Sequence, residues 1–163
     1  MLRASAMIFG LGACRYSEYR PDSKVEMTMT TRLNPYLSFR GDARSAMEFY
    51  QSVFGGELNA STFAEFGASD DPAEKDQIMH SQLETPNGLT LMGADTPASM
   101  PFDVGNNVSV SLSGEDTEEL TGYWDKLAVG AQNTMGLNKA PWGDTFGMLT
   151  DKFGINWLVN ISG

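Results

Sequence analysis

His80 is the only histidine in the chain, and imidazole is the side chain best suited to proton transfer near neutral pH. It falls in an alternating segment, Ile78 to Glu84, whose pattern predicts a β-strand. Met79 and Leu83 occupy the face of this strand that is expected to join the core. His80 is therefore expected on the opposite face, where it either contacts a ligand in a pocket or is a hydrogen-bonded structural histidine.

Gln82 and Glu84 share the expected face of His80, because side chains two positions apart in a strand point the same way. Glu84 suits the role of a carboxylate base or of a group that orients the imidazole, which makes His80 and Glu84 the candidate catalytic pair. A solvated glutamate beside a turn is the alternative for Glu84. Gln82 is a candidate ligand-binding residue.

Apolar and aromatic residues in the second half of the chain are candidates for the wall of a cavity. Trp142 lies in a predicted turn, Ala140 to Asp144, where it either caps a ligand at a pocket mouth or makes a rim contact in a dimer. The apolar wall of such a cavity is predicted to include Met92, Phe146 and Met148. Each of them also suits the role of ordinary core filling.

Two other patterns do not indicate a site. The acidic cluster of Asp70, Asp71, Glu74 and Asp76 lacks the spacing of an EF-hand, so a solvated loop is expected. The segment Ser111 to Gly114 lacks the G-x-S-x-G pattern of a nucleophile elbow.

Local signals predict the elements that position these residues. Asn34 to Phe39 alternates as a strand, Asp42 suits a helix N-cap, and Gly55-Gly56 ends the helical periodicity that follows. Leu58 to Phe66 is strand-like. Two further runs flank Thr85-Pro86-Asn87-Gly88, and Asn-Gly between alternating segments predicts a β-hairpin.

The strand–helix unit of residues 34–57 recurs in residues 107–132 at an offset of 73 positions, which aligns Tyr50 with Tyr123. Three strand candidates follow the second helix, at residues 132–139, 145–150 and 155–162. The order βαβββ, written twice, predicts an α+β fold of two similar halves. The space between such halves is a natural place for a ligand.

Composition limits the partners. The 163 residues suit one domain, and the formal net charge is −10. From Leu33 onward there are six Lys or Arg against eighteen Asp or Glu, a balance that repels nucleic acid and anionic membranes. A single cysteine, Cys14, forms no internal disulfide, so a reducing, cytoplasmic location is expected.

Residues 1–32 are expected to be a disordered or mis-started extension, with Met27 or Met29 as the natural start. The alternative is export as a lipoprotein, because Leu11 to Cys14 loosely matches a lipoprotein signal. The remaining chain is expected to be one domain made of modules 33–94 and 107–163, joined by a linker at 95–106.

The chain resembles the PhnB-like branch of the vicinal oxygen chelate superfamily, which includes glyoxalases, bleomycin resistance proteins and dioxygenases. Members of this branch are often labelled 3-demethylubiquinone-9 3-methyltransferase-like. The resemblance covers residues 33–161 and implies two βαβββ modules that curl into a cup-shaped mixed sheet around a cavity, usually in a homodimer. The segments that carry it are Leu33 to Phe39, Ala46 to Gly56, Met79-His80, Leu91-Met92, Ala94-Asp95, Trp142-Gly143 and Asp151 to Trp157.

Metal-using members of the superfamily place ligands on the first and last strands of each module. The matching positions in this chain are Pro35, Met92, Val108 and Leu158, none of which offers a donor for a divalent ion. No metal or other cofactor is therefore expected. Tyr36, beside the first of these positions, is expected to offer its hydroxyl to the cavity. The methyltransferase label gains no support from the sequence, because no glycine-rich strand-to-helix turn is present to seat S-adenosylmethionine.

The leading hypothesis is a metal-free, homodimeric protein that holds a small organic ligand in an apolar cavity. A lyase or isomerase that uses His80 with Glu84 or Tyr36 as acid and base is the first alternative. A non-catalytic dimeric interaction module is the second.

Overall fold

The computed structural model describes residues 31–163, of which residues 33–163 form one compact unit. The expectations for the amino-terminal extension, including Cys14 and the two possible starts, concern residues outside this range.

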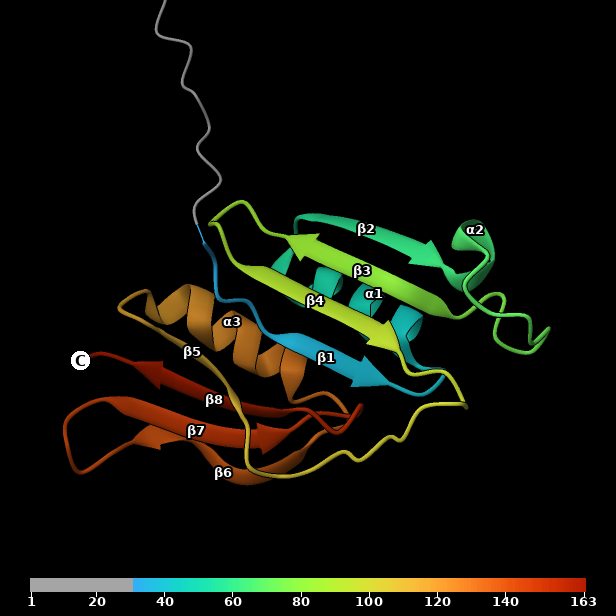
Figure 1. The fold of residues 1–163 in the computed structure, drawn as a ribbon. Helices are drawn as coiled ribbons and strands as arrows, with labels where there is room; N and C mark the ends of the chain where they lie inside the picture. The colour runs from blue at the N-terminus through green and yellow to red at the C-terminus, as the bar shows by residue number, and fades with distance from the viewer. Residues whose placement is uncertain (1–30) are drawn as a thin grey trace, which may run out of the picture. The chain divides into compact units, whose positions relative to one another are not determined.

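Eleven elements follow one another in two rounds (Figure 1). The first round comprises β1 (Tyr36–Phe39), α1 (Ala43–Phe54), β2 (Glu57–Thr62), α2 (Phe63–Phe66), β3 (Ile78–Glu84) and β4 (Thr90–Asp95). The second comprises β5 (Val110–Gly114), α3 (Thr117–Leu127), β6 (Gln132–Lys139), β7 (Thr145–Thr150) and β8 (Asn156–Ile161).

Each round forms its own four-stranded mixed sheet, in the order β1-β4-β3-β2 and β5-β8-β7-β6. The first strand of each sheet runs parallel to the last, and the other pairs are antiparallel. The two sheets thus have identical topology, and neither closes into a barrel. The predicted α+β fold of two βαβββ modules is confirmed.

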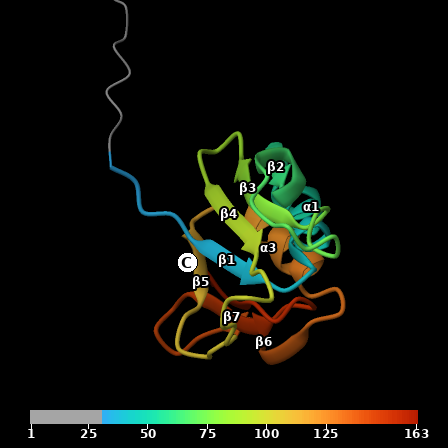
Figure 2. The same cartoon turned by 45° about the vertical axis from the view of Figure 1, so that its right-hand side comes forward.

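The two long helices bury the faces that their apolar periodicity predicts. In α1 the buried residues include Met47, Tyr50 and Val53, and in α3 they include Trp124 and Leu127. Helix α1 packs against its own sheet and against α3, which in turn packs on β5 and β8 (Figures 1 and 2). The core therefore lies on the helix side of both sheets and continues from one module into the other.

A buried carboxylate joins the modules inside this core. Asp151, in the turn between β7 and β8, accepts hydrogen bonds from the Tyr50 hydroxyl (2.7 Å) and the Trp157 indole Nε1 (2.8 Å). It also accepts from the backbone N–H groups of Phe153 and Ile155. Because Tyr50 belongs to α1, this turn of the second module is tied to the helix of the first.

Two details differ from the sequence-based expectations. The strand expected to reach Phe66 ends at Thr62, where a capping box formed by Thr62 and Glu65 begins the short helix α2. The N-caps Asp42 and Asp116 also show that Tyr50 corresponds to Trp124 and not to Tyr123, since both lie eight residues after the cap. The repeat is present, but its two helices align at an offset of 74 positions and not of 73.

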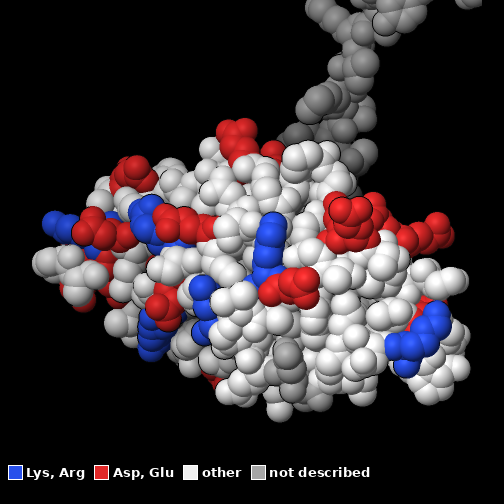
Figure 3. Space-filling model, turned by 180° about the vertical axis from the view of Figure 1, so that it is seen from behind, with Lys and Arg blue, Asp and Glu red and all other residues white. Residues whose placement is uncertain are grey.

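Charge on the helix side is dispersed. Figure 3 shows this face with Asp and Glu side chains spread over it, and with Lys and Arg side chains that do not merge into one broad basic surface. Within residues 31–163, no helix is long and apolar enough to cross a membrane.

Candidate functional site

The candidate site begins with the face of the first sheet that is turned away from α1. In the register of the sheet, Met92 on β4 pairs with Tyr36 on β1 and with Gln82 on β3. Their sequence neighbours Leu37, Leu83 and Leu91 are buried on the helix side. Because successive side chains alternate between faces, the three pairing residues lie in one row on the other face. We call the residues Tyr36, Ser38, His80, Gln82 and Met92 the open face of the first sheet.

His80 and Tyr36 contact each other on this open face. The Tyr36 hydroxyl oxygen lies 3.2 Å from His80 Nδ1, and the two rings stack with centroids 5.8 Å apart. Partial burial raises the pKa of Tyr36 above its ordinary value, so its hydroxyl keeps its proton at neutral pH. A neutral tyrosine donates to His80 whenever Nδ1 carries no proton. The pair can therefore hold a proton between a phenol and an imidazole.

A register irregularity accounts for the position of His80. Ser61 pairs with His80, whereas the next residue, Thr62, pairs with Ile78, so Met79 is the extra residue of a bulge. Ile78 is fully buried and Met79 is only half-buried. The sequence-based expectation that Met79 and Leu83 share the core face therefore holds for Leu83, while Ile78 takes the place of Met79.

Glu84 has a different partner from the one expected. The Gln82 amide Nε2 donates a hydrogen bond of 2.9 Å to Glu84 Oε1, and Glu84 is exposed near the hairpin turn. The contact of His80 is with Tyr36. A proton relay through His80 is thus better supported for Tyr36 than for Glu84.

The other predicted ligand-binding residues lie on the second sheet. Met148 pairs with Leu158 across β7 and β8, and the Trp142 and Phe146 rings meet edge to face at 5.6 Å. Trp142 is 62% exposed. The structure therefore gathers the predicted residues into two groups, one on each sheet. Among residues 31–163, no hydrogen bond or ring contact joins the two groups, and the turn after β6 lies far from β3 in Figure 1.

The four positions expected to correspond to family metal ligands lie at the first and last strands of the two sheets. Met92 pairs with Tyr36, and its backbone N–H also donates to the Pro35 carbonyl, so Pro35 lies beside β4 as expected. Leu158 pairs with Ser111, three residues after Val108. The four expected positions, Pro35, Met92, Val108 and Leu158, offer no side-chain donor for a divalent ion. Residues 31–163 contain no group of three or more His, Cys, Asp or Glu side chains placed to hold a metal.

A cavity of about 310 Å³ adjoins Tyr36, which was expected to face a cavity, but its wall of linker residues was not expected. Its lining includes Tyr36 and Ser38 on β1, Asn156 on β8, and linker residues such as Asp103 and Asn107. The linker is held beside β1 by Arg40, whose guanidinium donates to the Met100 carbonyl (2.8 Å) and lies over the Phe102 ring. The run of Asp and Asn at residues 103–107 was the only sequence signal for this polar wall.

Two βαβββ modules with parallel first and last strands define a glyoxalase and bleomycin resistance type of fold. A glyoxylase/bleomycin resistance protein/dioxygenase domain from Frankia sp. EAN1pec shares this fold at 17% identity, with a TM-score of 0.57, over 83% of this chain and 94% of that one. Within this class, the family model for 3-demethylubiquinone-9 3-methyltransferase matches residues 31–160, and the chain belongs to that family. The predicted PhnB-like resemblance is confirmed.

Three relatives illustrate the match. The chain is 34% identical to the crystal structure of PA1353 from Pseudomonas aeruginosa, with a TM-score of 0.70, over 82% of this chain and 98% of that one. It is 26% identical to a putative 3-demethylubiquinone-9 3-methyltransferase, PhnB protein, from Bacillus cereus, with a TM-score of 0.66 and coverage of 81% and 100%. It is 29% identical over 140 residues to Protein YjdN of Escherichia coli (strain K12), covering 79% and 94%.

The family name implies a methyl donor, but the strand-to-helix turn before α1 does not fit S-adenosylmethionine. Such a cofactor is usually held by free backbone N–H groups at a glycine-rich turn before a helix. Here the N–H groups of Gly41 and Ala43 both donate to the buried carboxylate of Asp95, at 2.7 and 3.0 Å. The turn before α1 is thus already occupied by a side chain of the protein itself.

Proposed function

We propose that the protein binds a small organic molecule on the open face of the first sheet, without a metal. The observation that carries this proposal is the Tyr36–His80 pair, which stands beside Met92 and Gln82 on a half-exposed sheet face. A polar pair next to a thioether supplies the few oriented hydrogen bonds and the apolar contact area that small-molecule sites combine.

The chemistry of this face favours an uncharged ligand. The five residues of the open face include neither Lys nor Arg. The chain from Leu33 onward contains only six Lys or Arg but eighteen Asp or Glu. A carboxylate or phosphate would therefore lack a counter-charge and would be repelled by the surrounding protein. A carbonyl or hydroxyl group, by contrast, can accept from or donate to the Tyr36–His80 pair.

We propose further that a second copy of the chain completes the site. Tyr36, Trp142 and Met135 are each at least half exposed, which is unusual for large apolar side chains. Trp142 packs on Phe146 beside Met148, and its own side chain is 62% exposed. A homodimer that brings the second sheet of one copy over the first sheet of the other would unite the two groups.

The experiment is a thermal-shift screen of neutral aromatic and carbonyl compounds, followed by calorimetry on any compound that stabilises the full chain. His80→Ala and Tyr36→Phe should each weaken binding by about 1 to 3 kcal/mol, the range for a lost anchor or an unpaired polar group. Tyr123→Phe is the matched control, because Tyr123 lies on α3 away from the open face. Equal affinity in all three variants would exclude the open face as the site.

The hydrogen bond between Tyr36 and His80 also supports a second candidate, a metal-independent lyase or isomerase. Tyr36 would act as the acid and His80 as the base in proton transfer to or from a bound substrate. Turnover of a bound compound that survives chelation and disappears in His80→Ala would favour this enzyme. Tight capture without turnover would favour the binding protein.

A further inference from the structure

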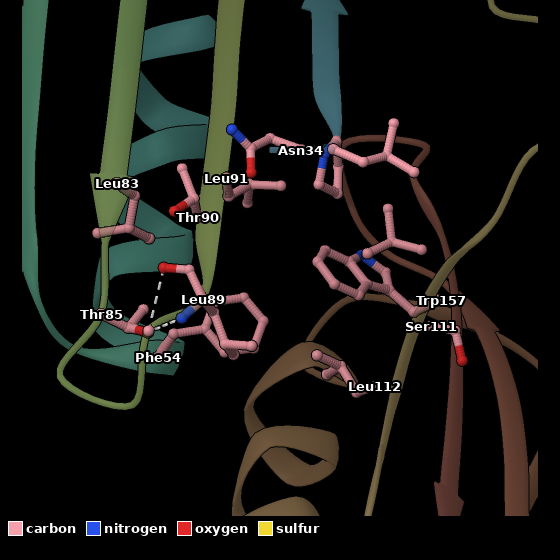
Figure 4. Close-up of a pocket in the computed structure, with 14 residues that line it drawn as sticks. Asn34, Phe54, Leu83, Thr85, Leu89, Thr90, Leu91, Ser111, Leu112 and Trp157 are labelled. Atoms are coloured by element: carbon pink, nitrogen blue, oxygen red, sulfur yellow. Dashed lines mark hydrogen bonds between the residues drawn. The ribbon is translucent and has the colours of Figure 1, made fainter. Parts of the chain in front are cut away.

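A second cavity lies on the opposite side of the sheets from the open face. It has a volume of about 280 Å³ and is lined by residues of both modules. Figure 4 shows Phe54, Leu83 and Leu91 from the first module and Leu112 and Trp157 from the second around one hollow. We call it the inter-module cavity. Proteins pack their interiors with few voids larger than a water molecule, so a hollow of this size can hold a ligand.

The walls of the inter-module cavity are held in place by the core. Leu83 and Trp157 are at most 1% exposed, and the Phe54 and Trp157 rings lie 5.6 Å apart. The Trp157 indole is further fixed by its hydrogen bond to Asp151. A ligand would therefore meet a preformed surface and would not have to order it, which lowers the cost of binding.

The lining also determines the chemistry of the occupant. None of the described residues that line the cavity is charged, and its side-chain polar groups are the amide of Asn34 and the hydroxyls of Thr85, Thr90 and Ser111. An anion would have no counter-charge there, whereas an uncharged ring can stack on Phe54 and Trp157. The volume is at the lower end of ligand pockets, which favours a compact molecule.

The inter-module cavity is separate from the open face because β-strand neighbours point in opposite directions. Leu91 lines the cavity, while Met92, the next residue, lies on the open face. Pro35 and Tyr36 divide in the same way, since Pro35 lines the inter-module cavity and Tyr36 contacts His80. A ligand in this cavity would be separated from His80 by the sheet itself.

We propose that the inter-module cavity is a second binding site, for a compact, uncharged molecule with an aromatic ring and one hydroxyl or carbonyl group. The ring would lie between the side chains of Phe54, Leu112 and Trp157. Its polar group would reach Asn34 or Thr90 at the rim. Occupancy would add contacts between the two modules, because both contribute walls.

The test uses 2-phenylethanol as the probe and phenylacetate, which has the same carbon skeleton but carries a negative charge, as its comparison. Both are titrated into the isotopically labelled full chain and followed by nuclear magnetic resonance. Saturable shifts of the Trp157 indole N–H and of the Leu91 and Leu112 methyl groups are expected with 2-phenylethanol. Phenylacetate should bind at least about tenfold more weakly, since an unpaired charge is costly to bury.

Leu91→Phe should fill part of the cavity and weaken binding of 2-phenylethanol by about tenfold or more. Leu137→Phe is the matched control, because Leu137 is half-buried on β6 and is not among the residues that line the cavity. If circular dichroism shows that Leu91→Phe does not fold, Leu89→Trp is used in its place. Leu89 also lines the cavity but is 40% exposed, so this position tolerates a larger side chain more readily.

Three results would overturn the proposal. The first is no saturable binding of 2-phenylethanol, or equal binding of phenylacetate. The second is an equal loss of affinity in Leu91→Phe and Leu137→Phe. The third is a shift of the cavity resonances on dilution, or on replacement of Ile8 and Phe9 by Ser, without any probe. Such a shift would assign the cavity to a second copy or to the amino-terminal segment instead.

Discussion

At the scale of single residues, two carboxylates organise the fold by accepting several hydrogen bonds each. Asp95 accepts from the N–H groups of Gly41, Ala43 and Ile78, which fixes the start of α1 against β3 and β4. Asp151 accepts two side-chain and two backbone donors in the core between the modules. Both carboxylates are about 95% buried, so their charge is tolerated because donors surround it.

Asp151→Asn should destabilise the protein by about 2 to 4 kcal/mol, because an amide nitrogen in place of one oxygen leaves a buried donor facing another donor. Chemical unfolding in urea would measure the change. Asp125→Asn makes the same chemical change on the exposed side of α3 and should stay within about 0.5 kcal/mol of the parent. Comparable effects in the two variants would show that Asp151 does not hold the modules together.

Stability should also fall at high pH through Tyr50. Burial raises the pKa of Tyr50 far above its ordinary value, and the charge and hydrogen bond of Asp151 raise it further. Because the folded state keeps this proton more tightly than the unfolded state does, the stabilisation is complete below about pH 10. Above that pH, up to about 1.4 kcal/mol should be lost per pH unit from this group. Urea unfolding at several pH values should show a shallower decline in Tyr50→Phe than in the parent.

At the scale of elements, the segments with strong local signals were predictable. The apolar periodicity of α1, its Gly55-Gly56 stop and the Asn-Gly hairpin between β3 and β4 appear as predicted. Helix α2 was missed because it depends on a capping box of two polar residues inside a strand-like run. The bulge at Met79 was missed because a single extra residue leaves no clear mark on an alternating pattern.

The candidate site was less predictable than the elements. Alternation placed His80 and Gln82 on one face, but the contact between Tyr36 and His80 requires β1 to pair with β4 and β4 with β3. Such pairing joins segments more than forty residues apart, and no local pattern encodes it.

The end of α1 offers a matched pair of glycine variants. Gly55 and Gly56 both have positive φ, 71° and 94°. A Cβ on Gly55 would meet nothing within 4 Å, whereas a Cβ on Gly56 would lie 2.2 Å from the backbone oxygen of Glu84. Gly55→Ala should therefore cost about 1 to 3 kcal/mol from backbone strain alone, because its ψ of −166° with positive φ is a conformation essentially restricted to glycine. Gly56→Ala should cost clearly more, about 3 kcal/mol or above, because β3 must move. Thermal and urea unfolding would rank them, and equal costs would contradict the close approach of Gly56 to the backbone of β3.

At the scale of the whole molecule, the two modules have the same topology but carry different side chains on their sheets. The first sheet carries the tyrosine–histidine pair, and the second carries the group of Trp142, Phe146 and Met148. Both cavities lie where the modules meet, since each is lined by residues of both modules and Val110 lines both.

If Pro35, Met92, Val108 and Leu158 occupy the family's ligand positions, purified protein should contain fewer than about one divalent ion in ten chains, because none of them offers a donor. A bound metal stabilises the folded state by mass action, so EDTA should leave the melting temperature unchanged. Elemental analysis and differential scanning calorimetry would measure the two quantities. Stoichiometric zinc, nickel, manganese or iron would contradict a metal-free site and would require donors other than these four.

The proposed homodimer makes a prediction about dilution. If two copies bury Trp142, Met135 and Tyr36 against each other, the melting temperature should rise with protein concentration, because association stabilises the folded state by mass action. Sedimentation should give twice the mass of one chain, and Trp142→Ala should shift this equilibrium toward the monomer by about 1 to 3 kcal/mol, the usual cost of truncating an aromatic anchor. Phe66→Ala is the control. Phe66 is 63% exposed, close to the 62% of Trp142, but it lies on α2, away from the open face of the first sheet and from the Trp142 group. A chain that stays monomeric at every concentration would leave the Trp142 group in solvent, and ligand binding would then have to rely on the open face of the first sheet alone.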